Sequence, residues 1–197
     1  IYSKKKTKSK LKMIRITSGI FRGRKINVPE GKNIKATSDQ VREAIFNILS
    51  SQLNWKEKAV LDLYAGSGSL GFEALSRGAS KVIFIEIDSK KIVTLNKNIQ
   101  LIIPQKKGVK LVKGRALKLI SNFSDSEIDY VIFIDPPFSS NEYNPVLEKI
   151  STLTSIRKGS FIVIQSSYKR KILIPKNLEI IKQRRYGSKR IYVLLKY

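Results

Sequence analysis

From residue 59 onward, apolar runs of strand length alternate with segments of helical periodicity, and this alternation restricts the fold more than any other feature. The expected strands are 59–64, 81–87, 109–113, 128–134 and 159–165. The expected helices are 69–77, 89–101, 115–121 and 143–156. Such alternation predicts an α/β protein with a parallel sheet and helices on both faces. Two last runs, 178–185 and 190–196, are joined by a short turn and predict an antiparallel hairpin that closes the sheet.

The segment before this core is expected to be a small extension. Residues 13–17 and 24–28 both alternate apolar with polar or basic side chains, so the turn 18–23 between them predicts a β-hairpin. A helix over 39–50 is predicted by apolar residues at helical spacing, namely Val41, Ala44, Ile45, Ile48 and Leu49. Thr37 with Gln40 matches a capping box for this helix, and Ser38 or Asp39 could cap it instead.

The composition is strongly basic, with 39 Lys and Arg against 15 Asp and Glu and a net charge of +24. This charge is typical of a protein that contacts phosphates, although a lysine-rich proteome would also raise it. The chain has no cysteine and no histidine, which excludes disulfides, Cys/His zinc sites and the usual general base near neutral pH. No apolar run approaches the ~20 residues of a membrane span, and no signal peptide is recognisable, so a cytoplasmic protein without membrane or metal partners is expected.

Residues 1–12 carry six lysines and almost no apolar side chains, which predicts a disordered basic tail. The tail either assists RNA binding or has no role, and Met13, which opens the patterned region, is suggested as the natural start. Residues 13–197 are expected to form a single domain, made of the extension 13–50 and the core 59–197.

The first candidate site follows the strand 59–64. Gly66-Ser67-Gly68-Ser69-Leu70-Gly71 fits G-x-G-x-x-G between a strand and a helix, with Glu86 at the end of the next strand. By spacing alone this is equally a dinucleotide fingerprint. Asp62 favours another ligand, because a carboxylate here would repel a pyrophosphate and attract the ammonium and sulfonium of S-adenosylmethionine. The cofactor-binding residues predicted here are Asp62, Tyr64, Ala65, Gly66, Ser67, Gly68, Glu86 and Ile87.

Three of these residues have more specific expectations. Gly66 and Gly68 let the backbone pass close beneath the ligand, and Glu86 can accept hydrogen bonds from both ribose hydroxyls. Gly71 is expected to serve helix-to-strand packing, and Asp88 to cap the next helix.

The second candidate site is Asp135-Pro136-Pro137-Phe138, after the strand 128–134. Carboxyl ends of parallel strands share one edge of a sheet, so both sites should face one cleft. The tetrapeptide resembles the Asp/Asn-Pro-Pro-aromatic element with which methyltransferases hold an exocyclic amine. Such an amine on a nucleobase is a poor nucleophile, and acceptors on its N–H bonds favour the tetrahedral nitrogen of the transition state. The Asp135 carboxylate and the Pro136 carbonyl can be those acceptors, held in place by the prolines, and Phe138 can stack on the base. The alternative is that the tetrapeptide is only a turn that ends a strand.

From Met13 to Tyr197 the chain resembles bacterial 16S rRNA guanine-N2 methyltransferases of the RsmD type. The resemblance is carried by residues 14–16, Gly19, 22–25, 37–47, the glycine turn with 70–79, and 135–138. It implies a Rossmann-like class I methyltransferase fold and methyl transfer from S-adenosylmethionine to N2 of one guanine in 16S rRNA. It also implies a partly assembled small subunit as partner, and we expect a monomer. Arg115 and Ala116 then lie where related enzymes contact adenine, although many of them carry an acid at the Arg115 position.

The resemblance extends to expected RNA contacts and includes three departures. The residues expected to line the RNA-facing side of the cleft are Arg22, Arg24, Lys25, Lys35 and Arg42, with Lys169-Arg170-Lys171 and Arg184-Arg185 as a second candidate patch. This chain has Lys35-Ala36 where the family usually has Arg-Pro, and Gln40 where the family usually has Arg. It has Gln165 where an acid often follows the fifth strand. None of them is expected to touch the chemistry.

Other functions remain open from the sequence alone. They are an amine methyltransferase acting on DNA adenine or cytosine or on protein glutamine, a non-catalytic RNA-binding protein, and a nicotinamide-dependent oxidoreductase.

Overall fold

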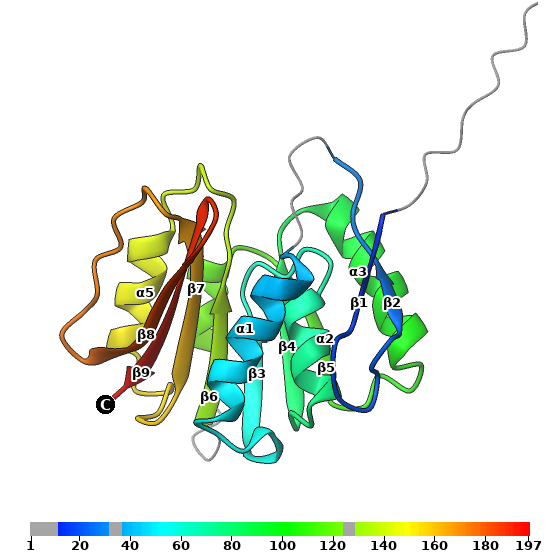
Figure 1. Ribbon diagram of the computed structural model, residues 1–197, viewed down its shortest axis with the longest axis horizontal. Helices are drawn as coiled ribbons and strands as arrows, with labels where there is room; N and C mark the ends of the chain where they lie inside the picture. Colours follow the sequence, from blue (N-terminus) through cyan, green and yellow to red (C-terminus); the bar gives the residue numbers. More distant parts are fainter. Residues whose placement is uncertain (1–11, 32–36, 124–128) are drawn as a thin grey trace, which may run out of the picture.

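The computed structural model describes residues 12–31, 37–123 and 129–197 (Figure 1). The expected disordered tail, apart from Lys12, lies outside the described residues, as do Lys35 and Ala36. No helix within the described ranges is both long enough and apolar enough to cross a membrane.

Within these residues, seven strands form one twisted sheet in the order β5-β4-β3-β6-β7-β9-β8. Its strands are β3 (Lys58–Asp62), β4 (Lys81–Glu86), β5 (Val109–Lys113), β6 (Asp129–Ile134), β7 (Phe161–Ser167), β8 (Leu178–Tyr186) and β9 (Lys189–Lys196). The first five run parallel, and β9 pairs antiparallel with both β7 and β8. The expected sheet and its closing hairpin are therefore confirmed, with no strand end shifted by more than two residues.

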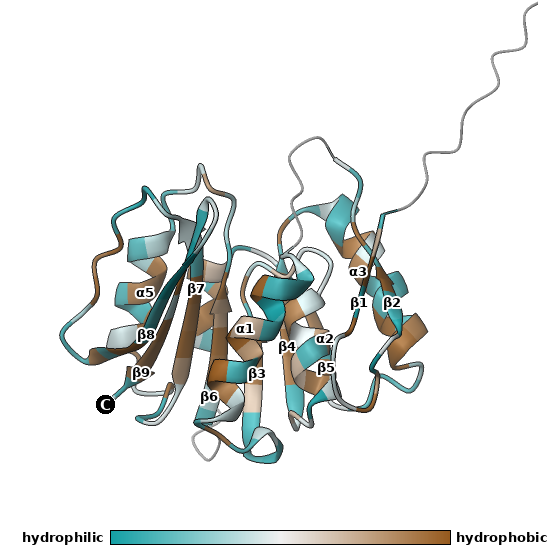
Figure 2. Ribbon diagram, viewed as in Figure 1, coloured by the Kyte–Doolittle hydropathy of each residue, from teal (hydrophilic) through white to brown (hydrophobic). Residues whose placement is uncertain are grey.

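Helices cover both faces of the sheet, because successive strand residues point to opposite sides. On β6, Val131 and Phe133 join one core cluster together with α1 (Asp39–Ser50), α2 (Ser69–Ser76) and α3 (Ser89–Ile102). Tyr130 and Ile132 join a second cluster together with α4 (Ala116–Leu119) and α5 (Tyr143–Thr152). Figure 2 shows apolar central strands and a hydrophilic β8, whose charged side chains suit an exposed sheet edge. The result is three layers with the sheet in the middle.

The expected N-terminal extension is a hairpin, β1 (Met13–Arg15) with β2 (Lys25–Asn27), followed by α1. The helix α1 has the predicted bounds, and Ser38 is its N-cap, accepting a hydrogen bond from Val41 N. Thr37 does not cap the helix, so the capping-box expectation is wrong. The hairpin lies along α2 and α3, with its turn beside the C-terminal end of α2 (Figure 1).

One buried carboxylate attaches this hairpin to α2. The Glu73 side chain accepts hydrogen bonds from Thr17 N at 2.8 Å, Thr17 Oγ1 at 2.7 Å and Ser18 N at 3.0 Å. It also lies 3.1 Å from Arg77 Nε and 3.6 Å from Arg42 Nε. Because Glu73 is fully buried, these partners replace the water that an ionised carboxylate needs.

Candidate active site

The two predicted sites meet at the point where the strand order reverses. After β3 the chain adds β4 and β5 on one side of the sheet, then returns to add β6 on the other side. In such sheets the crevice beyond the carboxyl ends of the strands at this switch point binds ligands. A cleft of ≈ 790 Å³ lies there, lined by residues that follow β3, β4, β5 and β6.

Nearly all of the predicted cofactor residues line this cleft. They are Asp62, Tyr64, Ala65, Gly66, Ser67, Glu86, Ile87, Arg115 and Ala116. Gly68 does not line it. Gly68 is the N-cap of α2 with φ +81°, and a Cβ there would lie 2.6 Å from both Leu95 and Phe72 side-chain atoms. This glycine is therefore required by the turn and by packing, whereas its neighbour Gly66 forms the cleft wall.

Asp62 is a carboxylate in an unusual setting. It is 3% exposed, and its Oδ2 accepts a hydrogen bond from Gly71 N at 3.2 Å. Burial raises the pKa of Asp62 to about 7; the Gly71 hydrogen bond opposes this, and the charges of Asp135 and Glu86 add to it. Among the described residues Asp62 makes no ion pair within 4 Å. A cleft with a buried, uncompensated acid favours a cationic ligand.

Gly71 and Asp88 have the structural roles expected of them. A Cβ on Gly71 would lie 2.2 Å from a Phe84 ring atom, so helix-to-strand packing requires glycine here. Asp88 caps α3 by accepting from Lys90 N and Lys91 N.

Glu86 shapes the glycine turn as well as the cleft. Its Oε2 accepts from Gly66 N at 3.0 Å, and its Oε1 accepts from Ile87 N and Asp88 N at 2.9 Å each. A carboxylate offers about four lone-pair sites, so acceptor capacity remains for a ligand. The exposed Ile87 side chain beside it is an apolar surface at the mouth of the cleft.

Glu142, which precedes α5, lies in the wall of the cleft and contacts residues that follow β3 and β5. Tyr64 Oη donates to Glu142 Oε2 at 2.9 Å, and Arg115 Nε lies 3.7 Å from Glu142 Oε1. Arg115 therefore pairs with a carboxylate across the cleft. Ala116, the first residue of α4, lies buried beside it.

On the other side of the switch point, all four residues of Asp135-Pro136-Pro137-Phe138 line the cleft. Asp135 Oδ2 accepts from Gln165 Nε2 at 2.6 Å and lies 3.4 Å from Thr37 Oγ1. Gln165 Oε1 in turn accepts from Lys189 Nζ at 2.9 Å. An ammonium only donates, so the Gln165 amide must turn its oxygen to Lys189 and its NH₂ to Asp135. One oxygen of Asp135 is thus engaged, and Oδ1 has no such partner among the described residues.

The surroundings of Asp135 also set its protonation. Burial raises the pKa of Asp135 to about 6, whereas the positive charge of Lys189 and the hydrogen bond with Thr37 lower it. The departure of Gln165 from the family pattern therefore does touch this site, and the expectation that it would not is wrong.

The backbone carbonyls of Pro136 and Phe138 are each held by a hydrogen bond from a side chain. Tyr143 Oη, buried in α5, donates to the Pro136 carbonyl at 3.0 Å, which leaves that oxygen a second lone pair. Arg170 Nη2 donates to the Phe138 carbonyl at 2.6 Å. The Phe138 ring is 37% exposed, and Lys189 Nζ lies 5.8 Å from its centroid. An exposed aromatic ring at the edge of a cleft is a surface on which a planar ligand can stack.

Three of the cations expected on the RNA-facing side of the cleft, Arg22, Arg24 and Lys25, do not line it. Arg22, Arg24 and Lys25 are exposed, but they belong to the hairpin whose turn lies at the C-terminal ends of α2 and α3, away from the carboxyl ends of the strands. Arg24 Nη1, for example, donates to the carbonyl of Ile102, the last residue of α3. This part of the expectation is wrong, because the backbone of the hairpin turn is fixed to the end of α2 through Ser76.

Arg42 is also not an RNA-facing residue. It is 1% exposed, and its guanidinium donates to the carbonyls of Thr37 and Arg15 and pairs with Asp39. Arg42 therefore joins α1 to the N-terminal hairpin, and a cation engaged in this way cannot meet phosphates.

Several cleft residues were not singled out from the sequence as part of the site. The extension contributes Val28, Pro29 and Thr37, the β9 strand contributes Lys189, and Lys91 and Glu142 complete the walls. Thr37 and Lys189 lie far from Asp135 in sequence. For Thr37 the only sequence signal was that it begins the stretch 37–47, which carries part of the family resemblance. For Gln165 the available signal was its departure from the family pattern near the end of the fifth strand, and the structure places it within β7.

The fold and the cleft are those of a class I methyltransferase. A family model described as conserved hypothetical protein 95 matches residues 14–195, and the chain belongs to this family. Ribosomal RNA small subunit methyltransferase D of Haemophilus influenzae is 32% identical over 181 residues, covering 91% of this chain and 93% of that protein. Its namesake from Buchnera aphidicola of Acyrthosiphon pisum is 34% identical over 171 residues, covering 87% of each.

Solved structures agree with this assignment. A putative methyltransferase from Escherichia coli, yhhF, has a TM-score of 0.79 at 26% identity and covers 94% of this chain and 98% of its own. A putative methylase from Haemophilus influenzae has a TM-score of 0.78 at 28% identity, with 94% and 99% covered. The Rossmann-like class I fold expected from the sequence is confirmed.

Proposed function

We propose that this enzyme transfers a methyl group from S-adenosylmethionine to the exocyclic N2 amine of one guanine in 16S rRNA, within a partly assembled small subunit. The observation that carries the proposal is that Asp62 and Asp135 line a single cleft, one on each side of the switch point of the sheet. The rRNA substrate is supported by the names of the relatives. Transfer of labelled methyl groups to this RNA tests the proposal.

The residues on the β3 and β4 side fit a cationic cofactor. Asp62 is buried without a cation, and the Gly66 backbone is held against the Glu86 carboxylate. Asp62 would face the positive charges of S-adenosylmethionine, Glu86 would accept a hydrogen bond from one ribose hydroxyl, and Ile87 and Ala116 would flank adenine. When bound, this cofactor supplies a methyl group on a sulfonium, which is electrophilic without any metal or further activation.

The residues on the β6 side fit the acceptor base. Asp135 Oδ1 and the second lone pair of the Pro136 carbonyl are the two acceptors left for the amine N–H bonds. Gln165 and Thr37 hold Oδ2, so the carboxylate cannot rotate freely, and this preorganisation is what makes electrostatic stabilisation effective. Phe138 would stack on the base, and Asp135 can take the proton at Oδ1 when the methylated amine releases it.

Cofactor identity gives the first test. We expect calorimetry to show binding of S-adenosylmethionine and not of NAD, and Glu86→Ala to weaken that binding by roughly 1–3 kcal/mol, the scale of hydrogen bonds to a charged group. Glu179→Ala is a matched control, because Glu179 is an exposed carboxylate on β8, away from the cleft. Tight NAD binding without a response to S-adenosylmethionine would contradict the cofactor assignment.

The pH dependence of the reaction gives a second test. Asp135 must be ionised to accept from the amine, so kcat/KM should be retained above its pKa of about 6 and lost as the pH falls through it. The Lys189 charge lowers that pKa, and Lys189→Met should therefore move the acid limb of the profile to higher pH. An unchanged acid limb in Lys189→Met, at normal cofactor binding, would show that another group sets the profile.

A DNA or protein amine remains the competing substrate, because the Asp-Pro-Pro-Phe element does not encode its acceptor. What favours RNA is the family to which the chain belongs and its net charge of +24. Substrate competition between rRNA, DNA and glutamine peptides distinguishes these possibilities.

A further inference from the structure

A basic surface adjoins the active-site cleft at the carboxyl ends of β7 and β8. We call it the β7 rim, and it is formed by Tyr168, Lys169, Arg170, Lys171 and Arg185. A shallow hollow in this rim is lined by Phe138, Ser139, Ser167, Lys169, Arg170 and Lys171. Phe138 and Ser139 also line the main cleft, so the hollow continues directly from the proposed base site.

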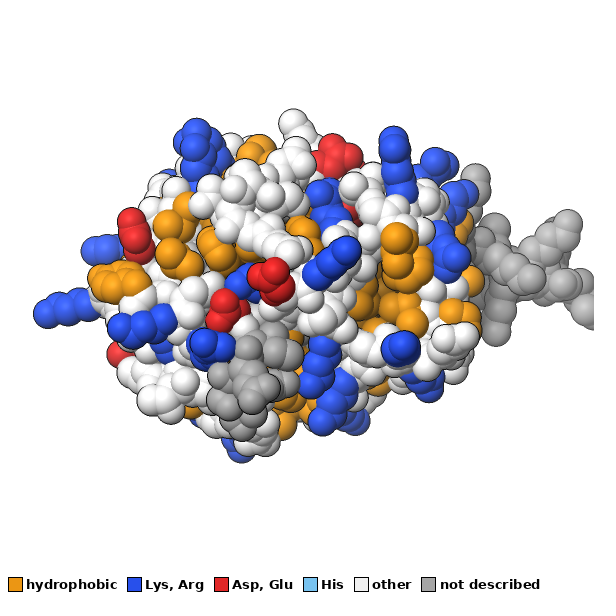
Figure 3. Space-filling model, turned by 90° about the horizontal axis from the view of Figure 1, so that it is seen from below, with side chains coloured by type: hydrophobic (Ala, Val, Ile, Leu, Met, Phe, Trp, Pro, Cys, Tyr) orange, Lys and Arg blue, Asp and Glu red, His pale blue; other side chains and the backbone are white. Residues whose placement is uncertain are grey.

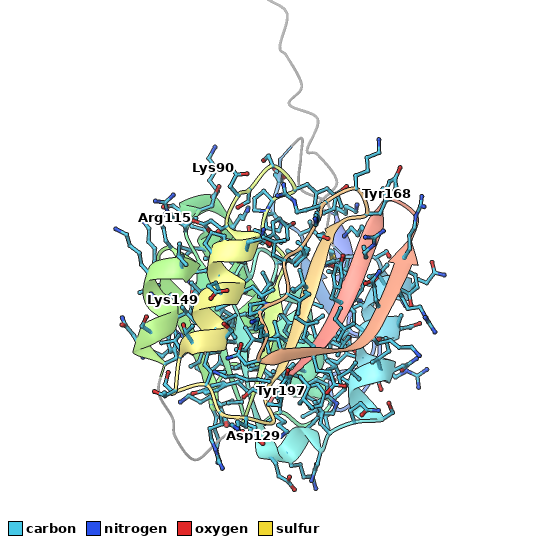
Figure 4. The ribbon with its side chains drawn as sticks, turned by 90° about the vertical axis from the view of Figure 1, so that its left-hand side faces the viewer. Lys90, Arg115, Asp129, Lys149, Tyr168 and Tyr197 are labelled. Atoms are coloured by element: carbon cyan, nitrogen blue, oxygen red, sulfur yellow. The ribbon has the colours of Figure 1, made fainter. Side chains whose placement is uncertain are left out.

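The residues of the rim are held in place by contacts with one another and with neighbouring segments. The Arg185 guanidinium lies 3.9 Å from the Tyr168 ring centroid, and Tyr168 N donates to Ser188 O at 3.0 Å, which joins the segment after β7 to the β8–β9 turn. Arg170 packs 4.7 Å from the Tyr143 ring centroid while it donates to the Phe138 carbonyl. Figure 4 shows Tyr168 at the same end of the molecule as Arg115 and Lys90, whereas Asp129 and Tyr197 lie at the other end.

The charge of the rim is of one sign. Between Gln165 and Asn177 the sequence has four cations and no Asp or Glu, and residues 182–190 add five cations without an acid. Within the described part of the chain, neither Lys169 nor Lys171 lies within 4 Å of a carboxylate. On the opposite face of the molecule, seen from below in Figure 3, Lys and Arg side chains are by contrast scattered among apolar and acidic ones.

We infer that the β7 rim binds the phosphates of the RNA strand next to the target nucleotide. This inference rests on the proposed function, and it locates the RNA contact on the rim instead of on the N-terminal hairpin. A base stacked on Phe138 would bring its adjoining phosphates over the hollow, where lysine side chains without carboxylate partners meet them. Phosphate contacts fix the register of a nucleic acid, so the rim would position the strand while the cleft selects the amine.

Two double variants with the same change of charge test the inference. Lys169→Gln/Lys171→Gln removes two rim cations, and the control Arg22→Gln/Lys25→Gln removes two exposed cations of the hairpin, outside the cleft. Binding to an unmodified 16S rRNA fragment is measured at several salt concentrations with cofactor-free protein. We expect the rim variant to bind about 10-fold more weakly and to flatten the salt slope by about 1.4, at roughly 0.7 per single-strand phosphate contact. The control should stay within twofold of the native protein.

The outcomes separate this inference from the proposed function. An unchanged affinity and slope in the rim variant, or a larger loss in the hairpin variant, would overturn the inference even if methyl transfer is normal. Tighter binding of duplex DNA than of the rRNA fragment would overturn RNA as the occupant. If the rim variant loses affinity as expected but the native protein transfers no methyl group, the rim assignment stands and the proposed reaction fails. Melting temperature and cofactor affinity of both variants should match the native values.

Discussion

Asp135→Ala is expected to lower kcat by about 10²–10³ while cofactor affinity and thermal stability stay near the native values. The substitution removes Oδ1, an acceptor for the reacting amine whose interaction strengthens in the transition state, and losses of this kind appear in kcat as well as in kcat/KM. The magnitude follows the removal of one preorganised oxyanion-hole donor in other enzymes. The measurement is methyl transfer to unmodified small subunits under single-turnover conditions, with calorimetry of cofactor binding on the same protein.

Asp135→Asn is the informative companion variant. Gln165 presents its NH₂ to residue 135 because Lys189 holds its oxygen, so an asparagine there should turn its own carbonyl to Gln165 and its NH₂ to the substrate amine. Two donors would then face each other, and we expect activity close to that of Asp135→Ala. Near-native turnover in either variant, or loss of activity only through unfolding, would show that Asp135 is a turn residue without a part in the chemistry.

The largest effect on stability is expected at Glu73, far from the chemistry. Glu73→Ala removes one of the two carboxylates within 4 Å of the buried Arg42 guanidinium, leaving only Asp39, and frees three hydrogen-bond donors of the hairpin. Breaking one partner of a buried ion pair costs about 3–5 kcal/mol. For a chain of this size that corresponds to a fall in Tm of roughly 10 °C. Denaturant unfolding of the two proteins measures the difference in free energy directly.

Glu57→Ala provides the matched control for Glu73→Ala. Glu57 is an exposed carboxylate in the short 3-10 helix before β3, and its removal should change the free energy of unfolding by less than about 0.5 kcal/mol. Equal, small losses in both variants would mean that the hairpin does not depend on the Glu73 contacts.

The strand and helix pattern of the core was predictable because buried parallel strands read as continuous apolar runs and their helices keep a 3.6-residue period. The two motifs could be assigned to one cleft for the same reason, since Asp62 and Asp135 each follow such a run. Boundaries were less accurate where the chain ends a helix without a sequence signal. The helix expected to reach residue 156, for example, ends at Thr152.

What the sequence did not reveal are contacts between distant segments. Arg42 looks like a surface cation in an amphipathic helix, and only the docking of the hairpin buries it. The sequence could not place Arg22 and Lys25 relative to the cleft. Contacts of the hairpin turn with Glu73 and Ser76 fix the turn at the end of the sheet away from the cleft, and no local pattern predicts these contacts. The link from Lys189 through Gln165 to Asp135 joins residues of three strands or strand ends, and no local pattern encodes such a meeting.

The most direct test of the central proposal is to identify the nucleoside that receives the methyl group. Purified protein with labelled S-adenosylmethionine is incubated separately with 30S subunits lacking this modification, naked 16S rRNA, and DNA, followed by nucleoside digestion and mass spectrometry. Our proposal predicts N2-methylguanosine at one position in 16S rRNA, formed by the native protein and lost in Asp135→Ala. A methylated adenine or cytosine in DNA, or no methylated nucleoside from any of the three substrates with a protein that binds the cofactor, would contradict it.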